Sequence, residues 1–367
     1  MRSSKTLSLI LCSRNDAYMG NSLWRLETTL NYVGDRVRSL GLDDDVEVIV
    51  ADWGSEVPLA EVVALGPAAA RIVSFLRVTP ALARDVQQDS PFPEVLALNA
   101  AARRARGQYI GRIDQDTLVG ERFLRWMFEA AAGPKEPALR RTLLFANRTN
   151  IPYRLAVLCP PLAVVERFVA WFGRWLWIEN GRVIYRNAVG IWLAHRDVWS
   201  ECGGYDERMI YMNDMEIDMV ERLMSTYPLF DLGSLLGYDF YHLDHYHPRG
   251  SRSSSSHREV NSHRLPPSLG VRPSGEAWGL AAYALERTSP VSRAPEASPT
   301  PAVFLGFSLY TAIRVGVDRL IYPRYPAWKR RAAIAWATVR GKPLKRWPWL
   351  LRQLWLDRPS ANGVVMR

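Results

Sequence analysis

The sequence predicts an α/β fold with a Rossmann-like, mostly parallel sheet that is flanked by helices. Apolar runs of strand length alternate with longer helical segments through the first part of the chain. Such alternation is typical of βαβ units and a parallel sheet. The predicted strands also end on polar residues, as they do where the loops at one edge of a sheet line a ligand crevice.

Each element of this sheet has a local signal. The apolar run at 6–12 has the length of a buried strand, and the polar loop Ser13–Asp16 follows it. The predicted elements, in order, are a strand at 6–12, a helix at 23–40, strands at 46–51 and 71–78, a helix at 94–106 and a strand that ends at Asp114. The loops at Ser13–Asp16, at Asp52 and at Asp114–Asp116 are therefore expected to face one crevice.

The most informative of these strand ends is Tyr109–Asp116. It carries two aspartates one residue apart, Asp114 and Asp116. Hard oxygen ligands suit Mg²⁺ or Mn²⁺, and such a cation can hold a diphosphate. The position of these carboxylates at a strand end predicts a nucleotide-sugar site.

A helix with an acidic start is predicted in the second half of the chain. The turn Gly203–Glu207 precedes this helix, which we expect at 214–224. Asn213 fits the N-cap position, and Glu216 stands three residues later as a capping partner. A second amphipathic helix, rich in tryptophan, is predicted at 162–177.

Three histidines are grouped after the helix predicted at 214–224. His242, His245 and His247 lie within six residues, beside Asp244. A single histidine is more often structural than a ligand, but a cluster that follows the last core strand favours a metal site. Imidazole beside carboxylates suits Mn²⁺.

The positive charge is concentrated in the last part of the chain. The net charge is +10, and residues 314–367 contain 13 Lys and Arg against two Asp. The remaining residues carry 34 basic and 35 acidic side chains. The tryptophans of this basic segment favour two interpretations: docking on an anionic membrane surface, or packing against the preceding domain. No recognised nucleic-acid module is present, so nucleic acid is not an expected partner.

The composition also indicates the cellular compartment of the protein. Cys12, Cys159 and Cys202 have no metal-like spacing and provide no disulfide framework, which favours a reducing compartment. We recognise no signal peptide, and no apolar run has the roughly 20 residues that span a bilayer. We therefore expect a cytoplasmic protein that lies peripherally on the inner face of a membrane if the basic segment docks there.

Three segments are predicted. Residues 1–248 form the compact domain, and residues 249–300 are a linker or mobile loop rich in Ser, Pro and Arg. This linker is expected to have little regular structure, apart from a short helix near 276–286. Residues 301–367 form a basic, Trp-rich helical extension.

The order of these motifs resembles that of the family-2-like inverting glycosyltransferases with the GT-A fold. The loop Ser13–Asp16 is similar to the one that opens their nucleotide pocket. The stretch Val48–Ser55 is similar to their strand that ends in Asp-Asp-Gly-Ser, with Trp53 in place of the second aspartate.

Three further motifs carry this resemblance. Asn99 matches the asparagine of the helix that precedes the D-x-D strand, and Asp114-Gln-Asp116 matches the D-x-D itself. Gly203–Glu207 is close to the Gly-Gly-Phe-Asp-Glu turn of the family. The match covers about residues 6–248.

The resemblance implies a function and a set of site residues. A hexosyltransferase would move a sugar, with inversion, from a nucleotide-diphospho-sugar to a glycan or lipid-linked acceptor in polysaccharide biosynthesis. Mn²⁺ or Mg²⁺ would be held by Asp114, Asp116 and either His242 or His245. The donor would contact six residues, among which Asp52 reads the base or ribose: Ser13, Arg14, Asn15, Asp52, Asn99 and Asp114.

The catalytic base is expected at the start of the 214–224 helix. The family motif can be aligned in two registers, which select Asp214 or Glu216. We prefer Asp214, because Glu216 has a competing capping role, and Asp218 ranks third. A helix N-terminus favours the ionised form that a base requires.

Two other functions fit parts of the sequence. A sugar-phosphate nucleotidyltransferase shares this type of sheet, but Cys12–Asn15 lacks the glycines of its phosphate loop. A degenerate GT-A protein that binds nucleotide or glycan would explain Trp53. It would also explain why the start of the 214–224 helix lacks the Glu-Asp pair that is usual in the family. An active glycosyltransferase is favoured instead by the presence of Asp114, Asp116, Asp214 and the histidines.

Overall fold

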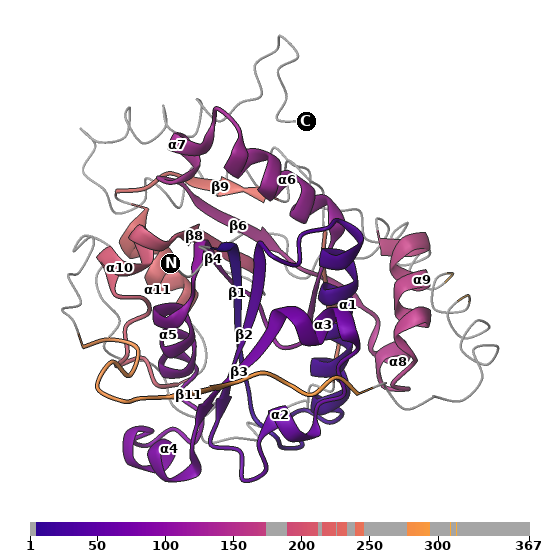
Figure 1. Ribbon diagram of the computed structural model, residues 1–367, viewed down its shortest axis with the longest axis horizontal. Helices are drawn as coiled ribbons and strands as arrows, with labels where there is room; N and C mark the ends of the chain where they lie inside the picture. Colours follow the sequence, from indigo (N-terminus) through magenta and orange to yellow (C-terminus); the bar gives the residue numbers. More distant parts are fainter. Residues whose placement is uncertain are drawn as a thin grey trace.

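The computed structural model describes residues 5–173, 189–211, 215–224, 226–232, 239–245 and 277–293, with Leu309 and Ile313. Within these residues, eight strands form a central sheet in the order β11-β3-β2-β1-β4-β8-β6-β9 (Figure 1). The strands of this sheet are β1 (Lys5–Ser13), β2 (Val46–Trp53), β3 (Val73–Val78), β4 (Gly107–Arg112), β6 (Leu143–Asn147), β8 (Val189–His195), β9 (Leu229–Asp231) and β11 (Glu286–Thr288).

A small second sheet lies beside the central one, in the order β5-β10-β7. Its strands are β5 (Thr117–Val119), β7 (Thr149–Ile151) and β10 (Phe240–Leu243). The helices in the described residues are α1 (Ser22–Ser39), α2 (Leu59–Val62), α3 (Pro67–Ile72), α4 (Pro80–Val86), α5 (Glu94–Arg104), α6 (Glu121–Ala132), α7 (Glu136–Leu139), α8 (Tyr153–Ala156), α9 (Leu162–Phe172), α10 (Arg196–Cys202) and α11 (Met215–Leu223).

The predicted α/β fold class is confirmed. Strand β1 pairs in parallel with β2 and β4, and β2 pairs in parallel with β3. Antiparallel pairing then adds β8 next to β4 and β6 next to β8. The chain crosses to opposite sides of β1 when it forms β2 and β4, so a topological switch point lies between β1 and β4.

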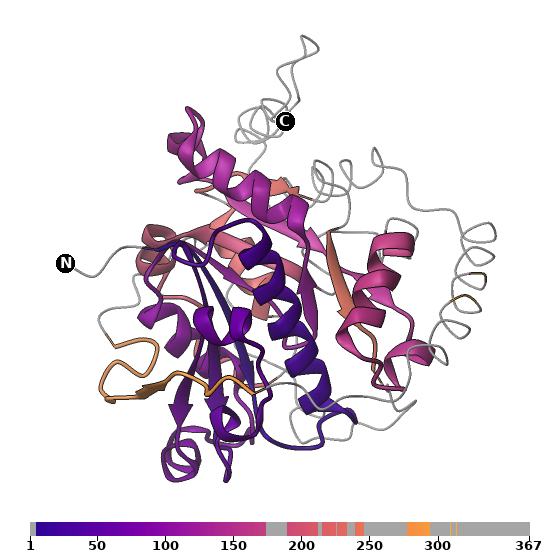
Figure 2. The same cartoon turned by 45° about the vertical axis from the view of Figure 1, so that its right-hand side comes forward.

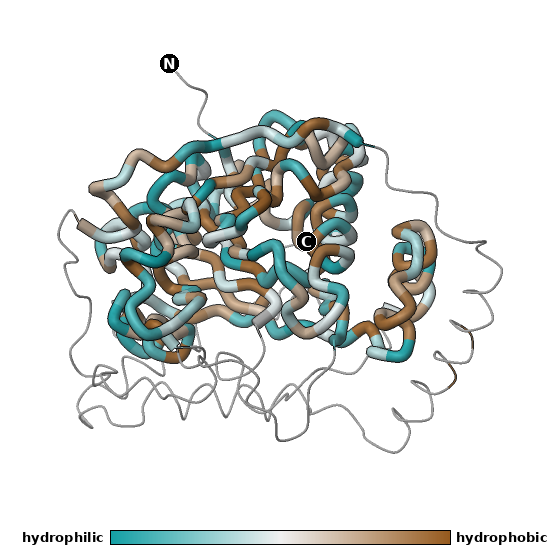
Figure 3. The backbone as a smooth tube through the Cα atoms, turned by 90° about the horizontal axis from the view of Figure 1, so that it is seen from below, coloured by the Kyte–Doolittle hydropathy of each residue, from teal (hydrophilic) through white to brown (hydrophobic). Residues whose placement is uncertain are grey.

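Helices cover both faces of the sheet, which explains the apolar runs within β1, β2 and β3. Side chains alternate along β1: Leu9 packs in one hydrophobic cluster with Leu26 and Leu30 of α1, whereas Ile10 packs in another with Leu98 of α5. Figure 2 shows α1 and α6 passing along one side of the sheet. In Figure 3 hydrophobic stretches lie in the interior, and also along the α8–α9 unit at the right.

The small sheet brings two distant parts of the chain together. Strand β5 follows the D-x-D turn directly and pairs antiparallel with β10, where His242 lies opposite Thr117. The backbone N–H of Leu243 donates to the carbonyl of Asp116 over 2.9 Å. This pairing brings His242 and His245 to the D-x-D turn.

Within the described residues 277–293, the short helix expected near 276–286 is not formed, and the regular element is a three-residue strand. Glu286–Thr288 form β11, which pairs antiparallel with β3 at the edge of the central sheet. The residues near 277–286, expected as a short helix, form turns that lead into this strand. Backbone pairing with β3 and ion pairs place the segment, so its polar composition is misleading.

Other boundaries differ slightly. Strand β4 ends at Arg112, and Asp114 lies in the turn that follows, where its carbonyl accepts from the N–H of Thr117. Asp214, His247 and the basic segment 314–367 lie outside the described residues. Among the residues that are described, no helix has the length and apolar character needed to cross a membrane.

Candidate functional site

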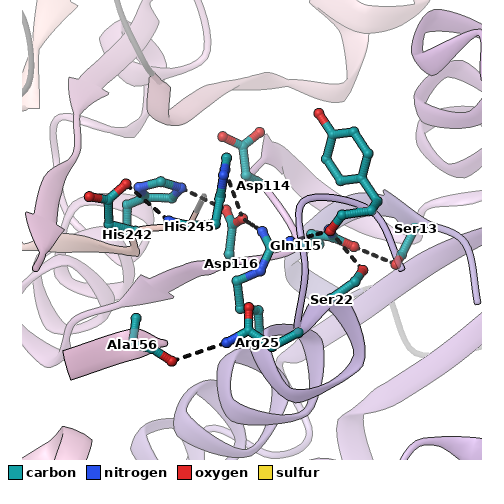
Figure 4. Close-up of polar contacts among 12 residues, drawn as sticks. Ser13, Ser22, Arg25, Asp114, Gln115, Asp116, Ala156, His242 and His245 are labelled. Carbon is teal, nitrogen blue, oxygen red and sulfur yellow. Dashed lines mark hydrogen bonds and ion pairs between the residues drawn. The ribbon is translucent and has the colours of Figure 1, made fainter. Parts of the chain in front are cut away.

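The candidate site lies at the carboxyl ends of β1 and β4, at the switch point of the sheet. Ser13 ends β1, and its hydroxyl donates to the side-chain oxygen of Gln115 in the D-x-D turn (Figure 4). Ser22, at the start of α1, lies beside the same glutamine. These contacts join the two loops that flank the switch point.

The loop after β1 is also tied to the loop after β2. The backbone N–H of Asn15 donates to the hydroxyl of Ser55 over 2.9 Å, and the Asn15 amide donates to the carbonyl of Val57 over 3.1 Å. Arg14 forms a 2.6 Å ion pair with Asp16 and donates to the carbonyl of Pro91. Arg14 and Asn15 are thus held by polar atoms of neighbouring loops at the carboxyl end of β1.

Asp52 lies under these loops with its carboxylate almost wholly buried. The hydroxyl of Ser55 and the N–H of Leu59 donate to its two oxygens, and Arg77 lies 3.5 Å away. Burial raises the pKa of Asp52, although these partners oppose the shift. Asp52, expected at the base or ribose, therefore holds the loop at 55–59 with its side chain.

Asp116, His242 and His245 form the densest group of metal-ligating side chains. One ligand atom of each lies within 4.8 Å of the other two. His242 Nε2 is 3.3 Å from Asp116 Oδ1, and His245 Nε2 is 3.8 Å from Asp116 Oδ2 (Figure 4). The sequence expectation left either histidine open, and the structure brings both to Asp116.

The cluster has polar partners on both sides of the His242 ring. His242 Nδ1 lies 3.0 Å from the side-chain oxygen of Asn150, and a protonated Nδ1 would donate to this oxygen. The buried Nε2 of His242 has no hydrogen-bond partner among the described residues. Burial disfavours the charged form of Asp116, but His242, Arg25 and Arg148 outweigh this and hold its pKa far below the ordinary value.

Asp114 has different partners from Asp116. Its carboxylate pairs with Arg112 over 2.7 Å and with Arg148. It is outside the group of Asp116 and the two histidines within the described residues. Asp114, expected to share one metal with Asp116, is instead paired with the guanidiniums of Arg112 and Arg148.

Arg112 is the centre of a second polar cluster. Its Nη2 lies 2.7 Å from Glu94 Oε1 and 3.2 Å from Glu216 Oε1, in addition to Asp114. Burial raises the pKa of Glu94 to about 7, and burial also raises that of Glu216. Three carboxylates therefore share one buried guanidinium, and Glu216 faces this cluster.

Asn99, expected at the nucleotide, is fully buried and holds the turn Gly203–Glu207. Its amide donates to the carbonyl of Tyr205 over 2.9 Å and to Glu207 over 3.0 Å, and its oxygen accepts from the N–H of Tyr205. Gly204 has a φ of +70°, and a Cβ there would lie 2.2 Å from the Asn99 oxygen. This close approach explains why the turn requires glycine.

Of the other carboxylates considered as base, Asp218 is buried in a 2.7 Å ion pair with Arg222. Sequence reasoning missed Glu94, Arg112, Arg148, Arg25 and Asn150, because none belongs to a motif. The position of Glu94 at the start of a helix after Pro91-Phe-Pro93 was the one local signal that could have marked it.

The sequence matches no family model and no curated protein. Among solved structures, the chain is similar to S. aureus TarS 1-349, with 14% identity and a TM-score of 0.39 over 65% of this chain and 60% of that one. A further structure of S. aureus TarS gives 11% identity and a TM-score of 0.38 over 65% of this chain and 36% of that one.

The catalytic domain of Drosophila beta1,4galactosyltransferase 7, in complex with xylobiose, is similar over 71% of this chain and 81% of that one. Its identity is 10% and its TM-score is 0.39.

Proposed function

We propose that this chain is a metal-dependent glycosyltransferase that uses a nucleotide-diphospho-sugar. The observation that carries the proposal is the cluster of Asp116, His242 and His245 at the switch point between β1 and β4. Ligands of α/β proteins bind at such switch points. A buried imidazole nitrogen without a hydrogen-bond partner beside an ionised carboxylate is the chemistry of a metal site.

Asp116, His242 and His245 would hold the cation, and the two imidazoles favour Mn²⁺ over Mg²⁺. A divalent cation supplies Lewis-acid neutralisation of a diphosphate. The chain's own residues would prepare this site: Asn150 would accept from His242 Nδ1 and leave Nε2 for the cation, and Arg25 pairs with the Asp116 carboxylate.

The donor would lie in the crevice beside this cluster. Ser13, Arg14 and Asn15 would line one wall, and their contacts to neighbouring loops would preorganise it. Asp114, fixed by Arg112 and Arg148, would accept hydrogen bonds from sugar hydroxyls on the opposite wall.

The transfer needs a carboxylate that accepts the proton of the acceptor hydroxyl. As that oxygen bonds to the anomeric carbon from the opposite face, the bond from this carbon to the diphosphate breaks and the nucleotide leaves, with inversion. Asp214 and Glu216 are the candidates at the start of α11. Glu216 is supported by its 3.2 Å contact with Arg112, next to Asp114.

The acceptor would be a hydroxyl of a glycan or lipid-linked saccharide, and the transferred sugar a hexose. We further propose that the basic, Trp-rich segment 314–367 docks on an anionic membrane surface. Co-sedimentation with vesicles that contain an anionic lipid tests this proposal. The chain should co-sediment, the chain shortened by residues 314–367 should not, and equal sedimentation of both would contradict it.

A donor-hydrolysis screen tests the main proposal. Purified protein is incubated with Mn²⁺ and a panel of UDP-, GDP- and dTDP-sugars, and released nucleotide is measured. We expect release from one donor, its loss with EDTA, and its loss in Asp116→Asn. Asp44→Asn is the matched control, because the Asp44 side chain is 87% exposed and remote from the cluster.

Asp116→Asn leaves Arg25 buried beside a neutral partner, and the variant can therefore be unstable. His245→Ala removes one ligand from the edge of the cluster and leaves that ion pair in place, so it is the second variant. Failure of every donor, together with nucleotide binding that is the same with and without Mn²⁺, would favour a degenerate binding protein. Release of pyrophosphate from nucleoside triphosphate and sugar phosphate would favour a nucleotidyltransferase.

A further inference from the structure

Residues 277–293, named the strap here, run along the edge of the sheet far from the metal cluster. Figure 1 shows this segment in orange, passing from beside α5 along β3 toward α2. Arg287 of β11 pairs with the buried Glu47 over 2.6 Å and donates to Ser74 over 2.8 Å. Arg293 donates to the carbonyl of Glu61 over 2.8 Å. The strap is thus anchored at its C-terminal side.

The N-terminal side of the strap is held by α5. Arg104 donates to the carbonyls of Gly279, Leu280 and Tyr283 over 2.7 to 3.0 Å. Arg103 lies over the ring of Trp278, and Leu280 is buried in the core. Three carbonyls on one guanidinium fix the backbone path of this turn.

Glu207 joins the strap to the turn that precedes α11. Its Oε1 accepts from the N–H of Gly279 over 2.7 Å and from the Asn99 amide over 3.0 Å. Gly279 has a φ of +68°, and a Cβ there would lie 2.6 Å from the Asn99 carbonyl. The strap, helix α5 and the turn Gly203–Glu207 therefore meet at one carboxylate, where the backbones are closely packed.

The turn is in direct contact with α11. Arg222 of α11 donates to the carbonyl of Gly204 over 3.1 Å and pairs with Asp218 one turn earlier on the same helix. Both charged side chains are almost wholly buried. Glu216, on the same helix, faces Arg112. A displacement of the turn would therefore move the carboxylate of Glu216.

We propose that Glu207 is a positioning residue: by joining Gly279 of the strap to Asn99, it sets the orientation of α11 and so of the Glu216 carboxylate. This inference rests on the proposed function of the site. Glu207 acts through hydrogen bonds that it accepts, and a neutral amide oxygen can accept the same two bonds. Burial raises the pKa of Glu207, in keeping with a role that does not need its charge.

The first experiment compares Glu207→Ala with Glu207→Gln. With the donor found in the screen, Glu207→Ala should lower kcat roughly 10- to 100-fold, since a displacement of about 1 Å can have this effect. KM for the donor and the affinity of Mn²⁺-dependent nucleotide binding should stay within about twofold of the wild-type values. Neither Glu207 nor Gly279 belongs to the metal cluster. Glu207→Gln should restore kcat. Equal kcat in Glu207→Ala and wild type would overturn the proposal.

The second experiment perturbs the same contact from the strap. Gly279→Ala places a methyl group against the Asn99 carbonyl, and it should reproduce the loss of kcat. Gly41→Ala is the matched control, because Gly41 has a φ of +69° and nothing within 4 Å of its added Cβ. A loss of kcat shared equally by both variants would indicate general backbone strain and refute the coupling.

Hydrogen exchange separates this inference from the proposed function. Gly279→Ala should accelerate amide exchange in residues 215–223 relative to Gly41→Ala, whether or not a sugar donor has been found. Unchanged exchange in α11 would overturn the inference even if the enzyme is active. If the wild type binds no nucleotide with any metal but exchange in α11 responds as expected, the proposed function fails and the mechanical coupling stands.

Discussion

Replacement of Glu47 by glutamine should cost the protein a large part of its stability. The carboxylate is almost wholly buried beneath the sheet edge and accepts four hydrogen bonds. The hydroxyl of Ser8 donates to Oε1 over 2.6 Å, as does the N–H of Arg106 over 2.5 Å. The guanidiniums of Arg106 and Arg287 donate to Oε2 over 2.9 and 2.6 Å.

The magnitude follows from these contacts. An amide keeps one acceptor oxygen, so Glu47→Gln retains the bonds on Oε1 but turns its NH₂ group toward two guanidiniums. Hydrogen bonds to charged groups contribute about 1.5 to 3 kcal/mol each. Arg106 is 41% exposed, so its share is discounted for solvent screening. We expect a loss of about 3 kcal/mol in the free energy of unfolding.

Urea unfolding, followed by circular dichroism, measures this loss. With a slope of about 3 kcal/mol/M, the midpoint should fall by about 1 M. Glu56→Gln is the control, because the Glu56 side chain is 82% exposed and should change stability by less than about 0.5 kcal/mol. Trypsin should also cleave at Arg287 sooner in Glu47→Gln. Equal midpoints in the two variants would refute the reasoning.

Three further predictions concern the site. Asn150→Ala should weaken Mn²⁺ binding roughly 10- to 100-fold in calorimetry, because Asn150 orients His242; unchanged affinity would contradict the role of this contact. Burial raises the pKa of Glu94 from 4.5 to about 7, so its contribution to stability is fully present below pH 4.5 and is lost as the pH rises through 7. Glu94→Gln should flatten the dependence of the free energy of unfolding on pH between pH 5 and 8. An unaltered dependence would show that another group is responsible for it. Gly204→Ala should destabilise the protein by more than about 3 kcal/mol, against about 1 kcal/mol for Gly41→Ala, and equal losses in urea unfolding would argue against the close approach to Asn99.

The parts of the fold that the sequence predicts well are those that local patterns determine. Strands β1 to β4 are apolar runs because helices cover both faces of the sheet, and their polar ends mark the crevice. The D-x-D turn and the histidine cluster were also visible as local groups of ligands. Their meeting at Asp116 required the pairing of β5 with β10, which no local pattern in either segment specifies.

The parts that the sequence does not predict depend on contacts between distant residues. Strand β11 reads Glu-Arg-Thr, which has no apolar alternation, and it is placed by backbone pairing with β3 and by the ion pair of Arg287 with Glu47. The cluster around Arg112 collects Glu94 and Glu216 from two helices. A single polar residue gives no local signal of the distant residue that it contacts. The contact of Asn99 with the turn was therefore not predictable either.

The late position of β11 in the chain has a consequence for synthesis on the ribosome. Arg287 follows its partner Ser74 by 213 residues. At about 5 to 20 residues per second, some 10 to 40 s pass between the emergence of β3 and that of the strand that covers its edge. Throughout this interval β3 presents open hydrogen-bonding groups to neighbouring chains, so nascent protein should be most prone to edge-to-edge association before residue 288 is made.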